Sequence, residues 1–276
     1  MPSDQLLVER DGPILVVSFN REDRLNSMGE EVHAALPETW QAVKKDRTIR
    51  AIVITGEGTR AFNTGMDLKE NAARGGHRES SDTTTYKEGV RMTPLQNDVW
   101  LPTIVAVNGL CVSGGLHFVA DADVVIASRN ASFFDTHTTV GQVSALEPIG
   151  LIPRIGLGNA LRLVVLAKAG RLSAEDALRI SLVDEVVEPE DLRSRAIELA
   201  HAAAKGSPTT IELSKRTIWN AVEQPLGEAL QYGLDVLREH RSHPDCKEGP
   251  LAFAEKREPR WVMPDAEPAG AEATNG

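Results

Sequence analysis

AFNTGMDLKE (residues 61–70) and NGLCVSGGLH (residues 108–117) are the two stretches that decide the fold of this chain. In each, a run typical of a β-strand leads through glycine and small residues into a run typical of a helix. The first N–H groups of a helix have no partner within it and lie at the positive end of its dipole. Two such junctions facing one point make an oxyanion hole, a pair of donors for the charge that develops on a carbonyl oxygen. The pattern therefore predicts chemistry that turns an acyl group into an enolate or a tetrahedral anion.

The composition is that of an ordinary globular protein. The 276 residues suffice for one large α/β domain, alone or with a smaller appendage, and 41% are hydrophobic and 25% charged. The net charge of −10 argues against a nucleic-acid partner. No apolar run approaches the length of about 18 residues that crosses a bilayer, and no secretory signal follows Met1, so we expect no membrane partner. Cys111 and Cys246 are the only thiols, which predicts a reducing, cytoplasmic setting.

Strand and helix patterns alternate along the first half of the chain. Two strands, over 6–8 and 14–19, are joined by a turn, and a helix over 28–45 should be kinked or interrupted at Pro37. Continuous apolar runs typical of strands covered on both faces follow at 51–55, 104–107 and 124–127. This alternation predicts right-handed crossovers and a largely parallel sheet.

The second half has a helical pattern from Pro148 onward. Ser173 and Ser207 are placed as N-caps, and proline follows Ser207 in the first turn.

Composition also divides the chain into regions. We expect a core over 1–200, a helical region over 201–261 and a disordered tail over 262–276. The polar, glycine-rich segment 74–85 is interpreted as a mobile lid or a disordered loop.

Seven motifs in order resemble the crotonase family, the enoyl-CoA hydratase/isomerase group that acts on coenzyme A thioesters. They are REDRLN (21–26), AIVITG (51–56), AFNTGMDLK (61–69), NGLCVSGG (108–115), DADVVIA (121–127), RLSAEDALRISLVDEVV (171–187) and PLAFAEKR (250–257). The resemblance covers nearly the whole chain, from about residue 6 to residue 261. It implies an α/β fold, a crotonase-like ββα spiral core with a helical C-terminal trimerisation region, and a homotrimer or a dimer of trimers.

The resemblance also implies site residues. It carries the oxyanion-hole donors onto the N–H groups of Met66 and Gly114. Contacts to coenzyme A, which belongs to the acyl-CoA substrate and is not a separate cofactor, then fall on Arg24, Leu25, Asp67, Leu68, Lys69, Phe253 and Lys256. The last two could act from a neighbouring subunit, and Asp67 could instead simply cap the helix that it precedes.

The chain departs from the family pattern at two positions. Typical hydratases hold the water with one glutamate three residues after the second oxyanion glycine and another beyond the next strand. Here the corresponding residues are His117 and His137. His117 lies one helical turn from Gly114, near a helix N-terminus, where an imidazole is disfavoured as a cation and can accept a proton. Since histidine has an ordinary pKa of about 6.5, both suit acid–base work, although each could be a hydrogen-bonded packing residue.

Three further acid–base groups belong to the candidate site. Glu147 could orient His137 or hold water, or it could be an exposed loop acid. His33 is either a third site histidine, as in a hydrolase branch of the family, or a partly buried helical residue. Asp135 precedes His137 by two residues and would share its face on an extended segment. The spacing of these residues predicts no metal site.

The leading hypothesis is an enoyl-CoA hydratase-like enzyme. It adds water across an α,β-unsaturated acyl-CoA, and His117 and His137 share the base and acid roles. One alternative is a retro-Claisen hydrolase of β-diketones, for which His33, His137 and Glu147 are suited. Another is a non-catalytic acyl-CoA-binding homologue with a decayed site, but two replacements by another acid–base residue favour an active enzyme.

Overall fold

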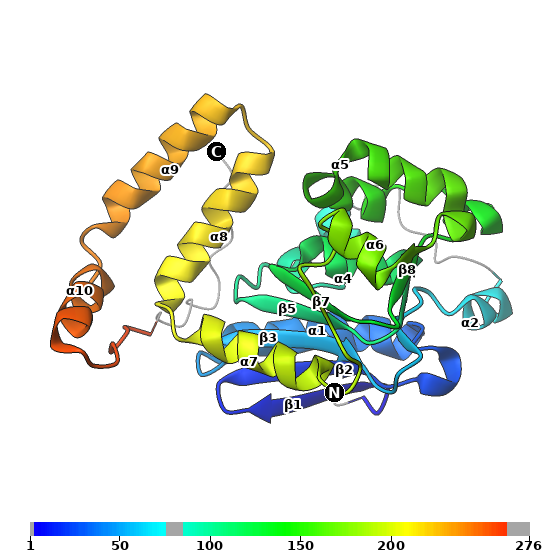
Figure 1. Cartoon of the computed structure of the whole chain (residues 1–276), viewed down its shortest axis with the longest axis horizontal. Coiled ribbons are helices and arrows are strands. Elements are labelled where there is room, and N and C mark those ends of the chain that lie inside the picture. The colour runs from blue at the N-terminus through cyan, green and yellow to red at the C-terminus, as the bar shows by residue number, and fades with distance from the viewer. Residues whose placement is uncertain (1–2, 76–84, 264–276) are drawn as a thin grey trace.

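The computed structural model describes residues 3–75 and 85–263, which form an α/β core with a helical extension (Figure 1). The strands are β1 (Leu6–Asp11), β2 (Ile14–Phe19), β3 (Ala51–Gly56), β4 (Ala61–Asn63), β5 (Thr103–Val107), β6 (Leu110–Val112), β7 (Val124–Ser128), β8 (Ser132–Phe134), β9 (Leu172–Ser173) and β10 (Glu185–Val187). The helices are α1 (Glu30–Lys45), α2 (Leu68–Ala73), α3 (Tyr86–Gly89), α4 (Leu116–Asp121), α5 (Leu146–Leu166), α6 (Ala174–Arg179), α7 (Leu192–Ala204), α8 (Pro208–Val222), α9 (Leu226–His240) and α10 (Asp245–Glu255). The predicted lid and tail lie mostly outside the described residues.

The strands form two sheets that are built together. The six-stranded sheet has the order β1-β2-β3-β5-β7-β10, and the four-stranded sheet has the order β4-β6-β8-β9. Only β1 runs antiparallel in the larger sheet, and only β9 in the smaller one, among the strands described. The pairs β3–β4 and β5–β6 each place one strand in each sheet before a helix follows. This repeat is the ββα spiral expected from the sequence, and the α/β fold class is confirmed.

Alternate side chains of the central strands enter two apolar layers. On one face, Val16, Val53 and Ile104 pack with Leu192 and Ala196 of α7. The opposite side chains of the same strands join the larger core, which contains Leu36 and Trp40 of α1 and side chains of the second sheet. The continuous apolar runs thus mark strands covered on both faces, as predicted.

Three details of the secondary structure differ from expectation. α1 continues through Pro37 without interruption. The second half of the chain is not only helical, since β10 pairs in parallel with β7 and β9 pairs with β8. These strands are three and two residues long, too short for periodicity to reveal. The caps at Ser173 and Ser207 are confirmed, because each hydroxyl accepts a hydrogen bond from an N–H group of the first turn.

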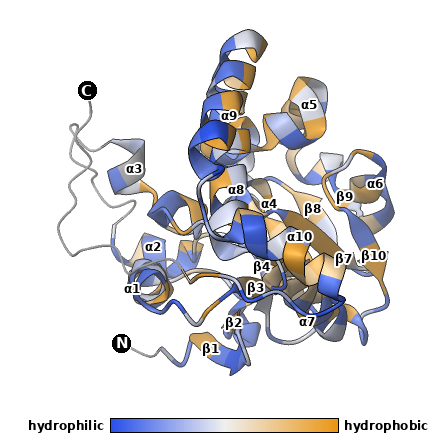
Figure 2. Cartoon of the chain, turned by 90° about the vertical axis from the view of Figure 1, so that its left-hand side faces the viewer, coloured by the Kyte–Doolittle hydropathy of each residue, from blue (hydrophilic) through white to orange (hydrophobic). Residues whose placement is uncertain are grey.

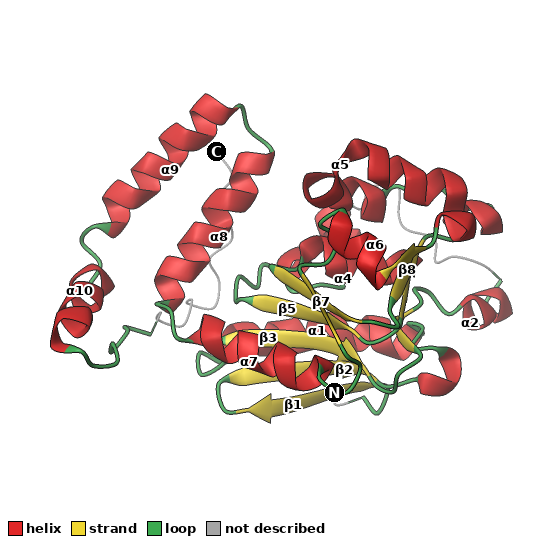
Figure 3. Cartoon of the chain, viewed as in Figure 1, coloured by secondary structure: helices red, strands yellow, loops and turns green. Residues whose placement is uncertain are grey.

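Helices α8, α9 and α10 extend away from the sheets (Figure 3). They carry large apolar side chains on their surface, and orange and blue segments alternate along α9 in Figure 2. The most exposed of these side chains are Ile218, Leu226, Leu230, Leu237 and Phe253.

The segment Leu146–Gly170, which contains α5, is long and apolar enough to cross a membrane by length and composition. This segment differs from the expectation drawn from the sequence, because Glu147, Arg154, Arg162 and Lys168 interrupt it and it contains no unbroken apolar run of that length. In the structure α5 packs on α4 and is bent at Gly156, which has a φ of +73°. Only 22% of the most apolar window is buried, so the helix presents an apolar outer face.

Candidate active site

The two glycine-containing stretches meet at one edge of the smaller sheet. β4 and β6 are parallel neighbours, so the chain leaves both strands at the same edge. After β4, Met28 donates to Gly65 O at 2.7 Å and accepts from Asp67 N at 3.0 Å. Because successive N–H groups of an extended segment alternate in direction, the intervening N–H of Met66 points away from Met28. A Cβ built on Gly114 would lie 3.9 Å from Met66 N, so both turns border one narrow gap.

Backbone geometry around the gap explains the residues that form it. Gly65 has a φ of +77°, and a Cβ there would come within 2.9 Å of Gly114 N. Ser113, directly before Gly114, adopts a left-handed φ of 48°, which costs a non-glycine residue roughly 1–3 kcal/mol. Its hydroxyl compensates, because Ser113 Oγ lies 3.0 Å from Asp135 Oδ1 and accepts from the Thr136 N–H at 3.0 Å. The strained turn is thereby tied to the neighbouring strand end.

A cavity of about 720 Å³ opens beside this gap. Its walls come from α1, from both turns, from the segment 89–92 and from the segment 141–147. All five residues expected to be catalytic from the sequence line it: Met66, Gly114, His117, His137 and Glu147. The structure therefore brings together groups that are up to 81 positions apart, from Met66 to Glu147.

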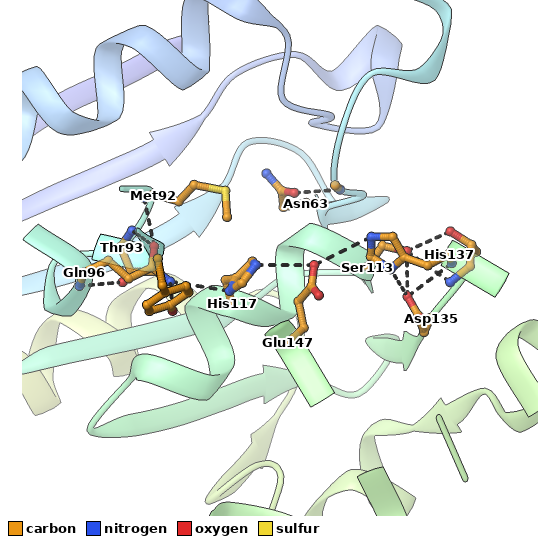
Figure 4. Close-up of polar contacts among 12 residues, drawn as sticks. Asn63, Met92, Thr93, Gln96, Ser113, His117, Asp135, His137 and Glu147 are labelled. Carbon is orange, nitrogen blue, oxygen red and sulfur yellow. Dashed lines mark hydrogen bonds and ion pairs between the residues drawn. The ribbon is translucent and has the colours of Figure 1, made fainter. Parts of the chain in front are cut away.

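Glu147 lies between the two histidines. Its Oε1 is 3.3 Å from His117 Nε2 and 3.7 Å from His137 Nε2. His117 projects from α4, His137 opens a short 3₁₀ turn after β8, and Glu147 is in the first turn of α5 (Figure 4). His117 and Glu147 are buried, whereas 20% of the His137 side chain is exposed. Glu147 is thus not an exposed loop acid, one of the two readings that the sequence left open.

Asp135 contacts the Nδ1 atom of His137. Asp135 Oδ1 lies 2.6 Å from His137 Nδ1. Burial acts to raise the pKa of Asp135, but the hydrogen bonds and charge of His137 and its other donors lower that pKa to about 2. The same hydrogen bond is the main cause that raises the pKa of His137 above its ordinary value. An ionised Asp135 therefore accepts the Nδ1 proton, and His137 Nε2 is left facing Glu147 and the cavity.

The pKa of Glu147 is set by competing effects. Burial acts to raise it, but the hydrogen bond and charge of His117 and the charge of His137 hold the pKa of Glu147 below its ordinary value. A carboxylate that stays ionised between two imidazoles can accept a hydrogen bond from one of them and stabilise the other as a cation. The three side chains form an acid–base unit and not three separate groups.

Sequence reasoning missed Gln96, which adjoins the buried side of His117. Gln96 Nε2 lies 3.4 Å from His117 Nδ1. The residue belongs to a short 3₁₀ turn, Leu95–Asn97, that has no helical periodicity and matches no motif. Figure 4 shows His117 between Gln96 and Glu147. Only the folded chain reveals this contact.

The residues expected to contact coenzyme A lie outside the cavity wall. Asp67 accepts from the N–H groups of Lys69 and Glu70 and pairs with Arg21 at 3.0 Å, so it caps α2, the simpler of its two readings. Leu68 and Lys69 are exposed at the start of this helix.

Arg24 is exposed and Leu25 half-buried, in the turn before α1. Phe253, 87% exposed, and Lys256 lie on and just after α10, at the opposite end of the long axis from α2 (Figure 1). Within one chain these two residues do not reach the cavity.

His33 is half-buried on α1 and also lines the cavity. It is therefore a partly buried helical residue that at the same time faces the site. Within the described ranges, no three His, Cys, Asp or Glu side chains are arranged to hold a metal ion.

Comparison with known proteins identifies the family. The sequence profile described as Enoyl-CoA hydratase/isomerase matches residues 9–264. The chain belongs to the enoyl-CoA hydratase/isomerase family. Among curated members of this family, (E)-benzylidenesuccinyl-CoA hydratase of Thauera aromatica is 33% identical, over 92% of this chain and 97% of its own. A short-chain-enoyl-CoA hydratase of Clostridium acetobutylicum is 29% identical, over 93% and 97%.

Solved structures of the enoyl-CoA hydratase/isomerase family are similar throughout. An enoyl-CoA hydratase/isomerase from Mycobacterium paratuberculosis superposes with a TM-score of 0.83 at 30% identity, covering 95% of this chain and 99% of that one. An enoyl-CoA hydratase from Bacillus anthracis superposes with a TM-score of 0.82 at 28% identity, covering 94% and 100%. The likeness therefore includes the spiral core and the helical extension.

Proposed function

We propose that this chain is a hydratase of α,β-unsaturated acyl-CoA thioesters in which histidines replace the two usual glutamates. The observation that carries the proposal is that Glu147 bridges His117 and His137 on the wall of the cavity that the Met66 and Gly114 turns border. The relatives support the reaction type, since their names are those of hydratases. A decayed site would have little reason to keep this buried, charged unit, because unpaired buried charges are costly.

The proposed reaction begins with the thioester oxygen between the N–H groups of Met66 and Gly114. The water oxygen bonds to Cβ, and His137 Nε2 takes one of its protons. The electron pair of the double bond then becomes an enolate whose charge lies on the thioester oxygen, where the two N–H groups stabilise it. The histidine–glutamate unit returns a proton to Cα, so that one water is added and the enzyme is unchanged.

We also propose that the chain assembles as a homotrimer or a dimer of trimers. Exposed apolar side chains follow α5, α9 and α10, and large apolar patches of this kind mark protein contacts. Phe253 and Lys256, on and just after α10, do not line the cavity of their own chain. In an assembly they would be available to coenzyme A bound to a neighbouring subunit.

Thermal unfolding should distinguish hydration from the β-diketone alternative, which the position of His33 on the cavity wall favours. A ligand that binds only the folded state at about 100 times its Kd adds about 2.7 kcal/mol of stability. We expect crotonyl-CoA to raise Tm by several degrees and a free cyclic β-diketone to leave it unchanged. Free coenzyme A and crotonate, tested separately, are the controls. A rise with the diketone alone would favour C–C bond cleavage.

The pH dependence of turnover should depend on Asp135. The reaction needs His137 Nε2 unprotonated, so activity falls as pH falls through the pKa of His137. Asp135 raises the pKa of His137, which places this acid limb at higher pH than for an ordinary histidine. In Asp135→Asn the limb should therefore move to lower pH, as measured by kcat/KM for crotonyl-CoA from pH 5 to 9.

A matched control is available on the surface. Asp11 pairs with His201 at 3.0 Å, far along the chain from the cavity residues, and both side chains are well exposed. Asp11→Asn should leave the acid limb in place. An acid limb that is the same in Asp135→Asn and in the unmodified protein would contradict the role of His137 as base.

A further inference from the structure

The side-chain amide of Gln96 has one orientation. Its Oε1 accepts hydrogen bonds from the N–H groups of Met92 at 2.9 Å and Thr93 at 3.2 Å. Backbone N–H groups only donate, so the oxygen must occupy this position and the amide cannot be flipped. The Nε2 hydrogens of Gln96 therefore point toward Tyr86 Oη, 3.3 Å away, and His117 Nδ1, 3.4 Å away.

His117 is bound at both ring nitrogens. Because Gln96 Nε2 is a donor, His117 Nδ1 must accept, and the proton of the neutral ring lies on Nε2. His117 Nε2 lies 3.3 Å from Glu147 Oε1, and the carboxylate accepts a hydrogen bond from this N–H group. Only 7% of the His117 side chain is exposed. Neither nitrogen is left to act directly on a substrate.

We infer that Gln96 is a positioning residue that holds His117 as a fixed donor to Glu147 and leaves His137 to exchange protons with the substrate. The division of labour between the histidines rests on the proposed function. The tautomer of His117 does not, because it follows from the backbone donors at Met92 and Thr93. His117 thus differs from the role that its sequence position suggests.

The other groups around His117 are compatible with this tautomer. Asp121 follows it by one turn on α4 and accepts hydrogen bonds from Thr93 Oγ1 at 2.5 Å and from the side chain of Gln96, which is again the donor. Burial nevertheless raises the pKa of Asp121. Tyr86 from α3 contacts Gln96, and burial raises its pKa too, so it stays a neutral phenol. Glu147 and His137 are also titratable groups of this site, and among the residues that the structure describes, Glu147 is the acid within ion-pair distance of His117.

The tautomer can be measured directly in the full-length protein labelled with ¹⁵N-histidine. Protonated and unprotonated imidazole nitrogens have well-separated ¹⁵N resonances, and the loss of signals in His117→Gln assigns this ring. We expect Nδ1 of His117 to be unprotonated and Nε2 to be protonated at neutral pH. A proton on Nδ1 in the unmodified protein would overturn the inference whether or not the enzyme is a hydratase.

Gln96→Glu tests the positioning role, since it keeps the shape and the backbone acceptor but replaces the donor by a second acceptor. The variant should place a proton on His117 Nδ1 and lower kcat for crotonyl-CoA by roughly 10- to 100-fold, with KM little changed. Gln96→Met, which removes the donor without adding charge, should give a mixture of tautomers and a smaller loss. Gln231→Glu, on the exposed face of α9, is the control and should leave kcat unchanged.

The outcomes distinguish the positioning role of Gln96 from the proposed function. A changed tautomer together with a reduced kcat supports the positioning role. A changed tautomer with unchanged kcat would overturn it. If Gln96→Glu does not fold, as judged by thermal unfolding, Gln96→Met decides the same question. If the unmodified protein hydrates no enoyl-CoA, the proposed function fails, while the NMR measurement still judges the tautomer.

Discussion

Replacement of His137 by alanine is expected to lower kcat for crotonyl-CoA by about 10²- to 10⁴-fold, the usual contribution of a positioned acid–base group. His137 is the imidazole whose Nε2 faces both Glu147 and the cavity, and its other nitrogen is held by Asp135. In the proposed reaction, its loss removes the group that accepts a proton from water. Binding of the acyl-CoA should be nearly unchanged, because the expected coenzyme A contacts lie elsewhere.

The experiment combines steady-state kinetics with calorimetric titration of a non-hydratable acyl-CoA. His201→Ala is the matched control, since His201 also pairs with an aspartate but does so on the surface. It should leave both kcat and Kd unaltered. If His137→Ala retained the turnover of the unmodified enzyme, His137 would have no part in the chemistry. If the acyl-CoA no longer bound, its role would be in binding and not in proton transfer.

Five of the six strands of the larger sheet were predictable from sequence because they carry long signals, whereas β10 has only three residues. β3, β5 and β7 are covered on both faces, so their residues form continuous apolar runs. The strands of the smaller sheet are only two or three residues long, and such lengths have no periodicity to detect. Their existence follows from pairing between distant segments, which no local window contains.

The candidate site likewise contains residues that the sequence could place and one that it could not. Met66, Gly114, His117 and His137 could be placed because they occupy fixed positions in motifs that resemble a family. Gln96 could not, since its contact with His117 depends on how a 3₁₀ turn packs against α4. A local pattern predicts which group is reactive, whereas its hydrogen-bond partners are set by tertiary packing.

The electrostatics of the site are compatible with the proposed use of two histidines in acid–base chemistry. Two buried carboxylates repel each other, whereas here one ionised glutamate lies between two histidines. Asp135 adds a second fixed negative charge behind His137. A carboxylate in the first turn of α5 therefore lies at the centre of the unit, and in the proposed reaction the histidine that faces the cavity carries the proton.

Gly114→Ala is expected to lower kcat by roughly 10²- to 10³-fold, the effect of losing one oxyanion-hole donor, because the added methyl group should block access to the N–H group of residue 114. The added Cβ would lie 3.9 Å from Met66 N and 3.3 Å from both Gly65 Cα and Met28 Cε. A methyl group there would crowd the gap between the two N–H groups, where the proposed mechanism places the thioester oxygen. The contacts are tight but not overlapping, so the fold should be retained.

Two measurements separate a blocked oxyanion hole from a damaged fold. Gly227→Ala is the control, because a Cβ at Gly227 meets no atom within 4 Å, and its kcat and Tm should match those of the unmodified enzyme. Gly114→Ala should unfold at nearly the same temperature, yet bound acetoacetyl-CoA should show less of the enolate absorbance that paired donors promote. Full activity in this variant would mean that the carbonyl does not lie between Met66 and Gly114, and the proposed chemistry would then lack its electrostatic basis.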